Sequence, residues 1–203
     1  MFFNYGMVKD QYSSSVRTKK NIRESCLLML LNKKNDELEV KELCKVAGIS
    51  RTTFYNHYQS LDGLFIDCLE NKLSRLSNEL KNKNYDEDDY LDSLLFDLSV
   101  FFKSDQEQIS SLVSVTGSYS YEYIKNIVND NLMKWLNLYH DDLLENNDFR
   151  MYISLCSHSI AGLYFDYFKK ELDCSLLDIV SVSKNLYKPL LKVKKPRQKK
   201  SLF

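Results

Sequence analysis

The side chains best suited to binding chemistry stand in one run of seven residues early in the chain. The run reads Arg51, Thr52, Thr53, Phe54, Tyr55, Asn56 and His57. Every member except Phe54 can form hydrogen bonds through its side chain, and the run contains no carboxylate. DNA bases present donors, acceptors and the thymine methyl group in the major groove, and phosphates line its edges. A helix exposing this run would therefore suit the major groove, although an ordinary solvated helix face is the simpler alternative.

Sequence motifs typical of catalysis are absent. The chain contains no phosphate-binding glycine loop, no Gly-x-Ser-x-Gly, no Cys/His nucleophile pattern and no Glu-x-x-His. The acidic run Tyr85–Tyr90 could hold a metal ion or perform acid–base chemistry, but no His or Cys lies near it. An acidic first turn is also favourable at the start of a helix. We therefore expect no enzymatic activity, no cofactor and no metal site.

Two short helices joined by a tight turn are predicted to position the polar run. Four apolar residues recur at helical spacing in the first helix, namely Val40, Leu43, Cys44 and Ala47. Gly48 follows where a left-handed backbone ends the helix. Ser50 is the expected N-cap of the second helix, and Ile49 and Phe54 should pack together across that cap. This pattern, which ends at Tyr58, is typical of a helix-turn-helix.

The same stretch resembles a known family. AGISRTTFYNHYQSLDGLF is similar to the helix-turn-helix of the TetR-type transcriptional regulators, and TKKNIRESCLLMLL is similar to the helix before it, so the match spans residues 17–66. SHSIAGLYFDYFKKEL resembles a late helix of the branch that includes the dihydroxyacetone-kinase regulator. The resemblance implies an all-α protein, in which an N-terminal three-helix head binds DNA and a helical-bundle body holds a dimer interface and an effector site.

Two positions depart from the family pattern. Glu39 stands where Ser or Thr usually precedes the first helix of the motif, and Leu61 stands where Lys usually begins the next helix. An acidic side chain at Glu39 suits the helix dipole but repels phosphate. We therefore expect Lys41, Tyr55 and His57 to contact phosphate. The full set of expected DNA-contacting residues is Lys41, Ser50, Arg51, Thr52, Thr53, Tyr55, Asn56 and His57.

Charge is distributed unevenly along the 203 residues. The formal net charge is zero, but residues 1–60 carry +4, residues 61–190 carry −10 and residues 191–203 carry +6. This asymmetry fits a nucleic-acid-binding end attached to a body that does not bind nucleic acid. The five cysteines show no paired spacing, and neither a signal peptide nor a long apolar run is readable. We therefore expect a cytoplasmic protein with no membrane segment.

Long helices are expected throughout, because the chain has only 5 Gly and 2 Pro. The predicted helices outside the motif span about 18–33, 61–82, 86–102, 106–115, 119–144, 149–171 and 175–191. We expect four parts: a disordered arm at 1–16, the DNA-binding domain at 17–66, a regulatory and dimerisation domain at 67–191, and a basic disordered tail at 192–203. The arm and the tail could add contacts to phosphate or could be plain disordered termini.

The last two predicted helices are the most apolar pair. In the family such a pair packs against its copy as a four-helix dimer interface. A two-fold dimer would place two recognition helices about one DNA turn, ~34 Å, apart, on a near-palindromic double-stranded operator. An intramolecular core is the alternative explanation of this apolar spacing.

The resemblance also implies an effector pocket inside the body. Aromatic and histidine side chains could line it, and the candidates are Tyr119, Tyr123, Trp135, Tyr139, His140, His158, Tyr164 and Phe168. Aromatic residues at helical spacing are equally typical of ordinary core. The expected function is a homodimeric DNA-binding repressor controlled by an unknown small-molecule or protein effector. The alternative is an adaptor or activator that works through a protein partner and binds DNA weakly or not at all.

Overall fold

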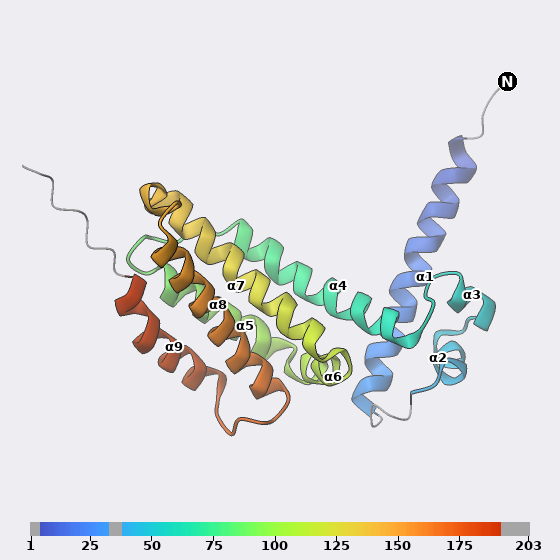
Figure 1. Ribbon diagram of the computed structural model, residues 1–203. Coiled ribbons are helices and arrows are strands. Elements are labelled where there is room, and N and C mark those ends of the chain that lie inside the picture. Colours follow the sequence, from blue (N-terminus) through green and yellow to red (C-terminus); the bar gives the residue numbers. More distant parts are fainter. Residues whose placement is uncertain (1–4, 33–37, 192–203) are drawn as a thin grey trace, which may run out of the picture.

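The computed structural model describes residues 5–32 and 38–191, and every regular element in these two ranges is a helix. One end of the molecule is a head made of α1 (Tyr5–Asn32), α2 (Val40–Ala47), α3 (Arg51–Tyr55) and the start of α4 (Leu61–Lys81) (Figure 1). The rest of α4 joins a helical body with α5 (Tyr90–Ser104), α6 (Gln106–Thr116), α7 (Ser118–Tyr139), α8 (Asn147–Phe168) and α9 (Leu176–Leu191). The short 3-10 helix η2 (Asp141–Leu143) follows α7. The expected all-α fold is confirmed.

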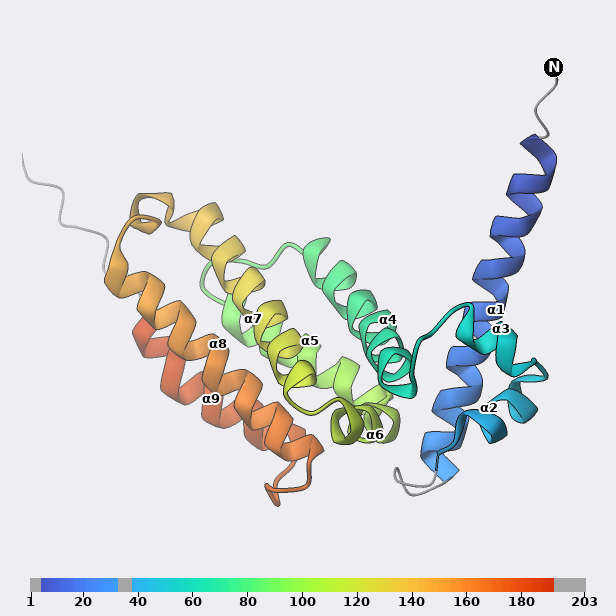
Figure 2. The ribbon, with the colours of Figure 1, turned by 45° about the vertical axis from the view of Figure 1, so that its right-hand side comes forward.

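The body is a layered bundle. Helices α7 and α8 lie side by side along its length, α5 packs against α9, and α9 also contacts α8 (Figures 1 and 2). Helix α6 lies between the ends of α1 and α8, and it contacts both. Helix α4 runs from the head into the body, so it and α6 connect the two parts.

A single hydrophobic core extends from the head through α4 into the body. An apolar stripe at helical spacing is buried along the whole of α4, and it comprises Leu64, Phe65, Cys68, Leu69, Leu73, Leu76 and Leu80. A similar stripe of α1 is buried at Ile22, Cys26, Met29 and Leu30. The boundary expected between residues 66 and 67 falls inside α4, which continues through it without a break.

The N-terminal prediction was wrong for most of its length. The first helix begins at Tyr5, whereas a disordered arm was expected up to residue 16 and a helix start at Thr18. The Thr18 hydroxyl donates to the Ser14 carbonyl at 2.9 Å, which is an interior helix contact and not a cap. The segment between these residues contains no proline, and serines weaken a helix only slightly, so the helix continues through Ser13–Ser15. Residues 1–4 and the expected tail at 192–203 lie outside the described residues.

Two boundaries in the body also differ from expectation. Helix α7 ends at Tyr139 and not near residue 144, because His140 leaves helical geometry with φ −146° and ψ 49°. Helix α8 begins at Asn147 and not near residue 149, because Asn146 is its N-cap and the Asn146 Oδ1 accepts from the N–H groups of Asp148 and Phe149. No helix within the described ranges is both long enough and apolar enough to cross a membrane.

Candidate nucleic-acid interface

The turn between α2 and α3 has the predicted geometry. Gly48 ends α2 in a left-handed conformation with φ 65° and ψ 34°, which glycine adopts without steric cost. The Ile49 N–H donates to the Cys44 carbonyl at 3.0 Å and closes the turn. Ser50 caps α3, since its Oγ accepts the Thr53 N–H at 3.0 Å. The turn therefore holds α3 at a defined angle to α2.

The cap of α3 gives the first testable prediction. Ser50→Ala removes the acceptor for the Thr53 N–H and should lower the free energy of unfolding by about 1 kcal/mol. Ser50→Asp restores an acceptor and should recover most of this loss. Urea denaturation of both variants measures the effect. Equal stability of the alanine variant and the wild type would show that the cap is dispensable.

The outer face of α3 exposes most of the predicted reading residues. Arg51, Thr52, Tyr55 and Asn56 are exposed, and Tyr55 keeps 55% of its surface accessible. Phe54, on the opposite face, is fully buried against the head. The exposed face is therefore polar, cationic at Arg51 and free of carboxylates.

The four other predicted contacts lie beside this face or take part in the cap of α3. Lys41 is exposed on α2, and His57 is half-buried just after α3. The Thr53 side chain is half-buried, and its hydroxyl shares a hydrogen bond of 2.9 Å with the Ser50 hydroxyl. Both hydroxyls therefore take part in the cap of α3. Glu39 is exposed at the start of α2 and makes no capping hydrogen bond through its side chain.

A polar network that no sequence pattern indicated ties α3 to α1 and α4. The Tyr58 hydroxyl donates to Asp67 Oδ2 at 2.5 Å, and the Arg23 guanidinium lies 3.0 Å from the same oxygen. The Asn21 amide donates to the Ala47 carbonyl at 2.7 Å and fixes the end of α2 on α1. Arg23 and Asp67 are 44 positions apart, so only the folded chain brings them together. This network sets the orientation of α3 on the helix that leads into the body.

The charge of Asp67 depends on this network. Burial alone would raise the pKa of Asp67, but the hydrogen bonds from Tyr58 and Arg23 outweigh burial and hold the pKa below its usual value. A carboxyl whose pKa is depressed on folding stabilises the folded state above its unfolded pKa of about 4, and this stability is lost as the pH falls through the lower folded value. The network is therefore intact at neutral pH and weakens in acid.

Asp67→Asn tests this contribution. We expect a loss of about 1 kcal/mol in the free energy of unfolding at pH 7, because the site is partly exposed and one charged partner of two hydrogen bonds is removed. The difference from the wild type should shrink below about pH 4, where the wild-type carboxyl also becomes protonated. Denaturation at pH 7 and pH 3 measures it, with Glu79→Gln on exposed α4 surface as the control. A difference that is independent of pH would assign the loss to packing.

Three of the predicted effector residues are core side chains. Trp135, Tyr164 and Phe168 are buried. Tyr164 and Phe168 both stack against Phe102, with ring centroids 4.8 and 5.2 Å apart. Burial raises the pKa of Tyr164 to about 12, so its hydroxyl stays protonated and bonds to Ser99 at 3.2 Å.

The other five predicted effector residues are spread over the body. Tyr119 and Tyr123 lie together on α7, and Tyr119 donates to Glu70 of α4. Tyr139 donates to the Tyr85 carbonyl at 2.6 Å. His140 stacks on Trp135, and its Nε2 lies 3.4 Å from Glu87, while the Nδ1 of His158 lies 2.8 Å from the carbonyl of Ser154 in its own helix. The eight residues therefore do not converge on one of the cavities described next.

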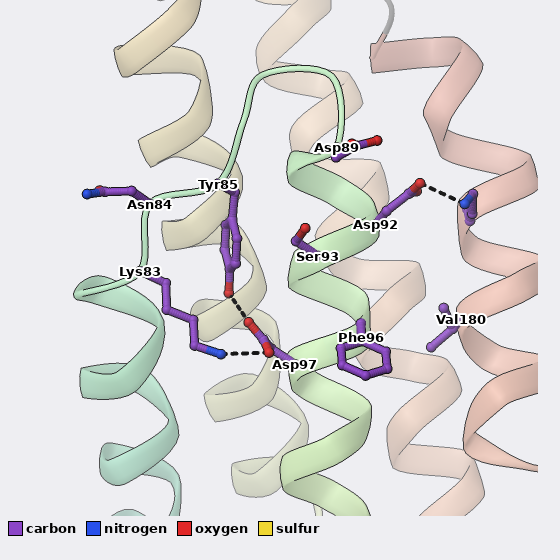
Figure 3. A pocket seen from close by; sticks show the side chains of 10 residues that line it. Lys83, Asn84, Tyr85, Asp89, Asp92, Ser93, Phe96, Asp97 and Val180 are labelled. Atoms are coloured by element: carbon purple, nitrogen blue, oxygen red, sulfur yellow. Dashed lines mark hydrogen bonds and ion pairs between the residues drawn. The ribbon is translucent and has the colours of Figure 1, made fainter.

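The first cavity, here called the α5–α9 cavity, has a volume of about 610 Å³ (Figure 3). Its lining residues are Lys83, Asn84, Tyr85, Asp89, Asp92, Ser93, Phe96, Asp97, Val180 and Lys184. Four of its five charged groups already pair with one another. Asp97 pairs with Lys83 at 2.6 Å and accepts from Tyr85, and Asp92 pairs with Lys184 at 2.7 Å. It lies wholly within the body.

The second cavity, here called the junction cavity, has a volume of about 790 Å³. It is lined by Leu31 of α1, by the first turns of α6, and by the end of α8 with the segment that leads to α9. The residues are Leu31, Gln106, Glu107, Ser110, Ser111, Tyr167, Phe168, Lys170, Leu172, Asp173 and Cys174. Phe168 is the one predicted effector residue in it. Across residues 5–32 and 38–191, no group of three or more His, Cys, Asp or Glu side chains gathers in a way that could hold a metal ion.

Comparison with known proteins shows which fold the chain shares. No protein-family model and no curated protein matches the sequence. Among solved structures, the chain is similar to a TetR transcriptional regulator from Rhodococcus sp. RHA1, with a TM-score of 0.63 at 13% identity over 89% of this chain and 98% of that one.

Two fatty-acid regulators are similar as well. The fatty acid degradation regulator FadR of Bacillus halodurans gives a TM-score of 0.61 at 14% identity over 87% of this chain and 97% of that one. Thermus thermophilus FadR, a TetR-family repressor solved in complex with lauroyl-CoA, gives 0.61 at 16% identity over 88% and 97%. Identities this low establish the fold and not the ligand. The protein has the fold of the TetR-family transcriptional regulators.

Proposed function

We propose that this protein is a DNA-binding transcriptional regulator whose head, residues 17–66, reads an operator through α3. The observation that carries the proposal is the exposed, carboxylate-free face formed by Arg51, Thr52, Tyr55 and Asn56 on a capped helix. Such a face offers donors and acceptors to base edges, and Lys41 and His57 flank it for phosphate contacts. The shared fold with TetR-family regulators supports the same reading.

We further propose that the body, residues 67–191, forms a homodimer through α8 and α9. Apolar side chains that a soluble monomer would leave in water gather on these two helices, and they are Met151, Tyr152, Leu155, Leu177, Val182 and Leu186. Gly162 lies in α8, where an added Cβ would meet nothing within 4 Å, so a second helix can approach closely there. Burial of this surface against a second copy would stabilise a two-fold dimer and align two heads on a near-palindromic site.

The proposed mode of action is effector-controlled repression. A regulator of this kind changes its DNA affinity only if the effector binds one conformation better than another. The FadR neighbour was solved with lauroyl-CoA, but both cavities described above carry several charged residues, which does not suit an acyl chain. Lauroyl-CoA is therefore not the ligand that we propose for either cavity. Membership of the dihydroxyacetone-kinase regulator branch stays a prediction.

Selection of bound duplexes from a random library by the purified protein tests the function. We expect a near-palindromic sequence, bound with an affinity that falls steeply as salt rises, because phosphate contacts release counterions. Recovery of no common sequence, together with weak binding of every duplex, would overturn the proposal. The exposed Glu39 at the start of α2 would then favour the alternative, an adaptor that acts through a protein partner.

A further inference from the structure

Lys170 has a backbone conformation that lysine rarely adopts. Its φ is 60°, and within the described residues it is the one non-glycine residue with positive φ. The Lys170 N–H donates to the Tyr167 carbonyl at 3.0 Å, and the Glu171 N–H donates to the Asp166 carbonyl at 2.9 Å. This is the paired hydrogen bonding that commonly ends a helix, and glycine usually occupies the left-handed position. The same residue lines the junction cavity.

The cavity wall around Lys170 combines opposite charges with apolar surface. Glu107 and Asp173 supply two carboxylates to the same lining, and Leu31 and Leu172 supply exposed aliphatic side chains. A purely anionic ligand would face both carboxylates, and a purely apolar ligand would form no ion pair with the exposed side chains of Glu107, Lys170 and Asp173. A small molecule with an ammonium group, a carboxylate and an apolar side chain matches all three kinds of surface.

The junction cavity also joins the two functional parts of the chain. Leu31 belongs to α1, which packs against α2 of the head, whereas Ser110 and Lys170 belong to the body. The Ser110 hydroxyl donates to the Phe168 carbonyl at 2.6 Å and so fixes the end of α8 on α6. A ligand that touches α1, α6 and the end of α8 senses any movement of the head on the body. The α5–α9 cavity is lined by the body alone and lacks this property.

We propose that the junction cavity is the effector site of this regulator and that it binds a free α-amino acid with an apolar side chain. The carboxylate of the ligand pairs with Lys170, its ammonium group with Glu107 and Asp173, and its side chain lies against Leu31 and Leu172. Occupation of the cavity changes the orientation of the head and therefore the affinity for DNA. The effect on DNA rests on the function proposed above, whereas binding of the amino acid does not.

Calorimetry on the full chain without DNA tests the site. The probes are L-leucine, L-methionine and L-phenylalanine, with N-acetyl-L-leucine and L-leucinamide as analogues that each lack one charge. We expect at least one free amino acid to bind, and both charge-deficient analogues to bind at least tenfold more weakly. In Lys170→Gly the same amino acid should lose at least tenfold in affinity. This variant relieves the left-handed strain, so its melting temperature should not fall. Lys83→Met in the α5–α9 cavity is the matched control and should bind as the wild type does.

A second measurement addresses regulation. The affinity of the wild type for its selected duplex should change at least fivefold at a saturating concentration of the bound amino acid, and the change should vanish in Lys170→Gly. The absence of binding by all three amino acids, or equal binding by Lys170→Gly and the wild type, would overturn the site. Binding without a change in DNA affinity would overturn its role as the effector site. If the protein binds no duplex even without amino acid, the proposed function fails, and the calorimetric result still decides the site.

Discussion

Replacing Arg51 and Tyr55 together with alanine should lower the affinity for a selected duplex at least a hundredfold. Both side chains are exposed on the outer face of α3, and the Tyr55 ring also contacts the buried Phe54 edge-on, with the ring centroids 5.3 Å apart. A contact to a base edge or a phosphate is worth about 1–3 kcal/mol, and the double variant removes two contacts in each subunit. Loss of the Arg51 contact should also relax the sequence preference at one position of each half-site. Fluorescence anisotropy with the selected duplex and a scrambled duplex measures both effects.

The control for this variant is Arg75→Ala, which removes the same charge from an exposed position on α4. It should bind the selected duplex within about twofold of the wild type, because long-range attraction between separated surface charges is largely screened at physiological salt. The double variant should unfold at the wild-type denaturant concentration, since neither side chain is part of the core. Equal DNA binding by the double variant and the wild type would mean that α3 is not the reading helix.

Leu155→Glu should convert the protein from a dimer to a monomer at micromolar concentration. Leu155 keeps 53% of its surface exposed on α8, within the proposed interface, so the isolated fold loses little when it is replaced. In a two-fold interface each substitution occurs twice, so two unpaired carboxylates would be buried. Each costs several kcal/mol, so the dimer dissociation constant should rise at least a thousandfold. Light scattering coupled to size-exclusion chromatography reports the mass directly.

The matched control is Leu138→Glu, a leucine with 55% of its surface exposed on α7, outside the proposed interface. This variant should remain a dimer. The Leu155→Glu monomer should also bind a palindromic duplex much more weakly than the wild type, because the two heads no longer bind as one unit. A monomeric wild type, or an unchanged mass for Leu155→Glu, would rule out α8 as the interface.

Local sequence was enough to predict the helix-turn-helix. Gly48, Ser50 and Phe54 adopt the predicted roles of helix end, cap and buried anchor. Each role depends on neighbours within a few positions, so short-range hydrogen bonding and helical periodicity decide it. The seven buried positions of α4 follow the same helical periodicity.

The prediction for the N-terminal residues was less accurate than the prediction for the helix-turn-helix. A disordered arm is expected over residues 1–16, which include the serines at 13–15, yet α1 runs through them from Tyr5. Serine lowers helix propensity by only about half a kcal/mol per residue, which the rest of a long helix can offset. A weak local preference thus yields to the cooperativity of the whole helix.

Contacts between distant residues required the tertiary structure. Aromatic residues recur at helical spacing in both α7 and α8, but they have different surroundings in the fold. Tyr164 lies in the core, Tyr119 donates to Glu70 of α4, and Tyr139 donates to the carbonyl of Tyr85. Periodicity tells which face of a helix is apolar and not which neighbour that face meets. For this reason the predicted effector set did not form a single cavity.

The sequence alone determined that the chain is helical, that a capped helix begins after Ser50, and that the outer face of this helix is polar and free of carboxylates. Only the tertiary structure brought Arg23 and Tyr58 onto Asp67, and only it placed Lys170 and Leu31 on the wall of one cavity. The first group of features arises from interactions across one or two helical turns, which a sequence displays directly. The second group joins residues separated by nine to more than a hundred positions, and their proximity depends on how the helices pack.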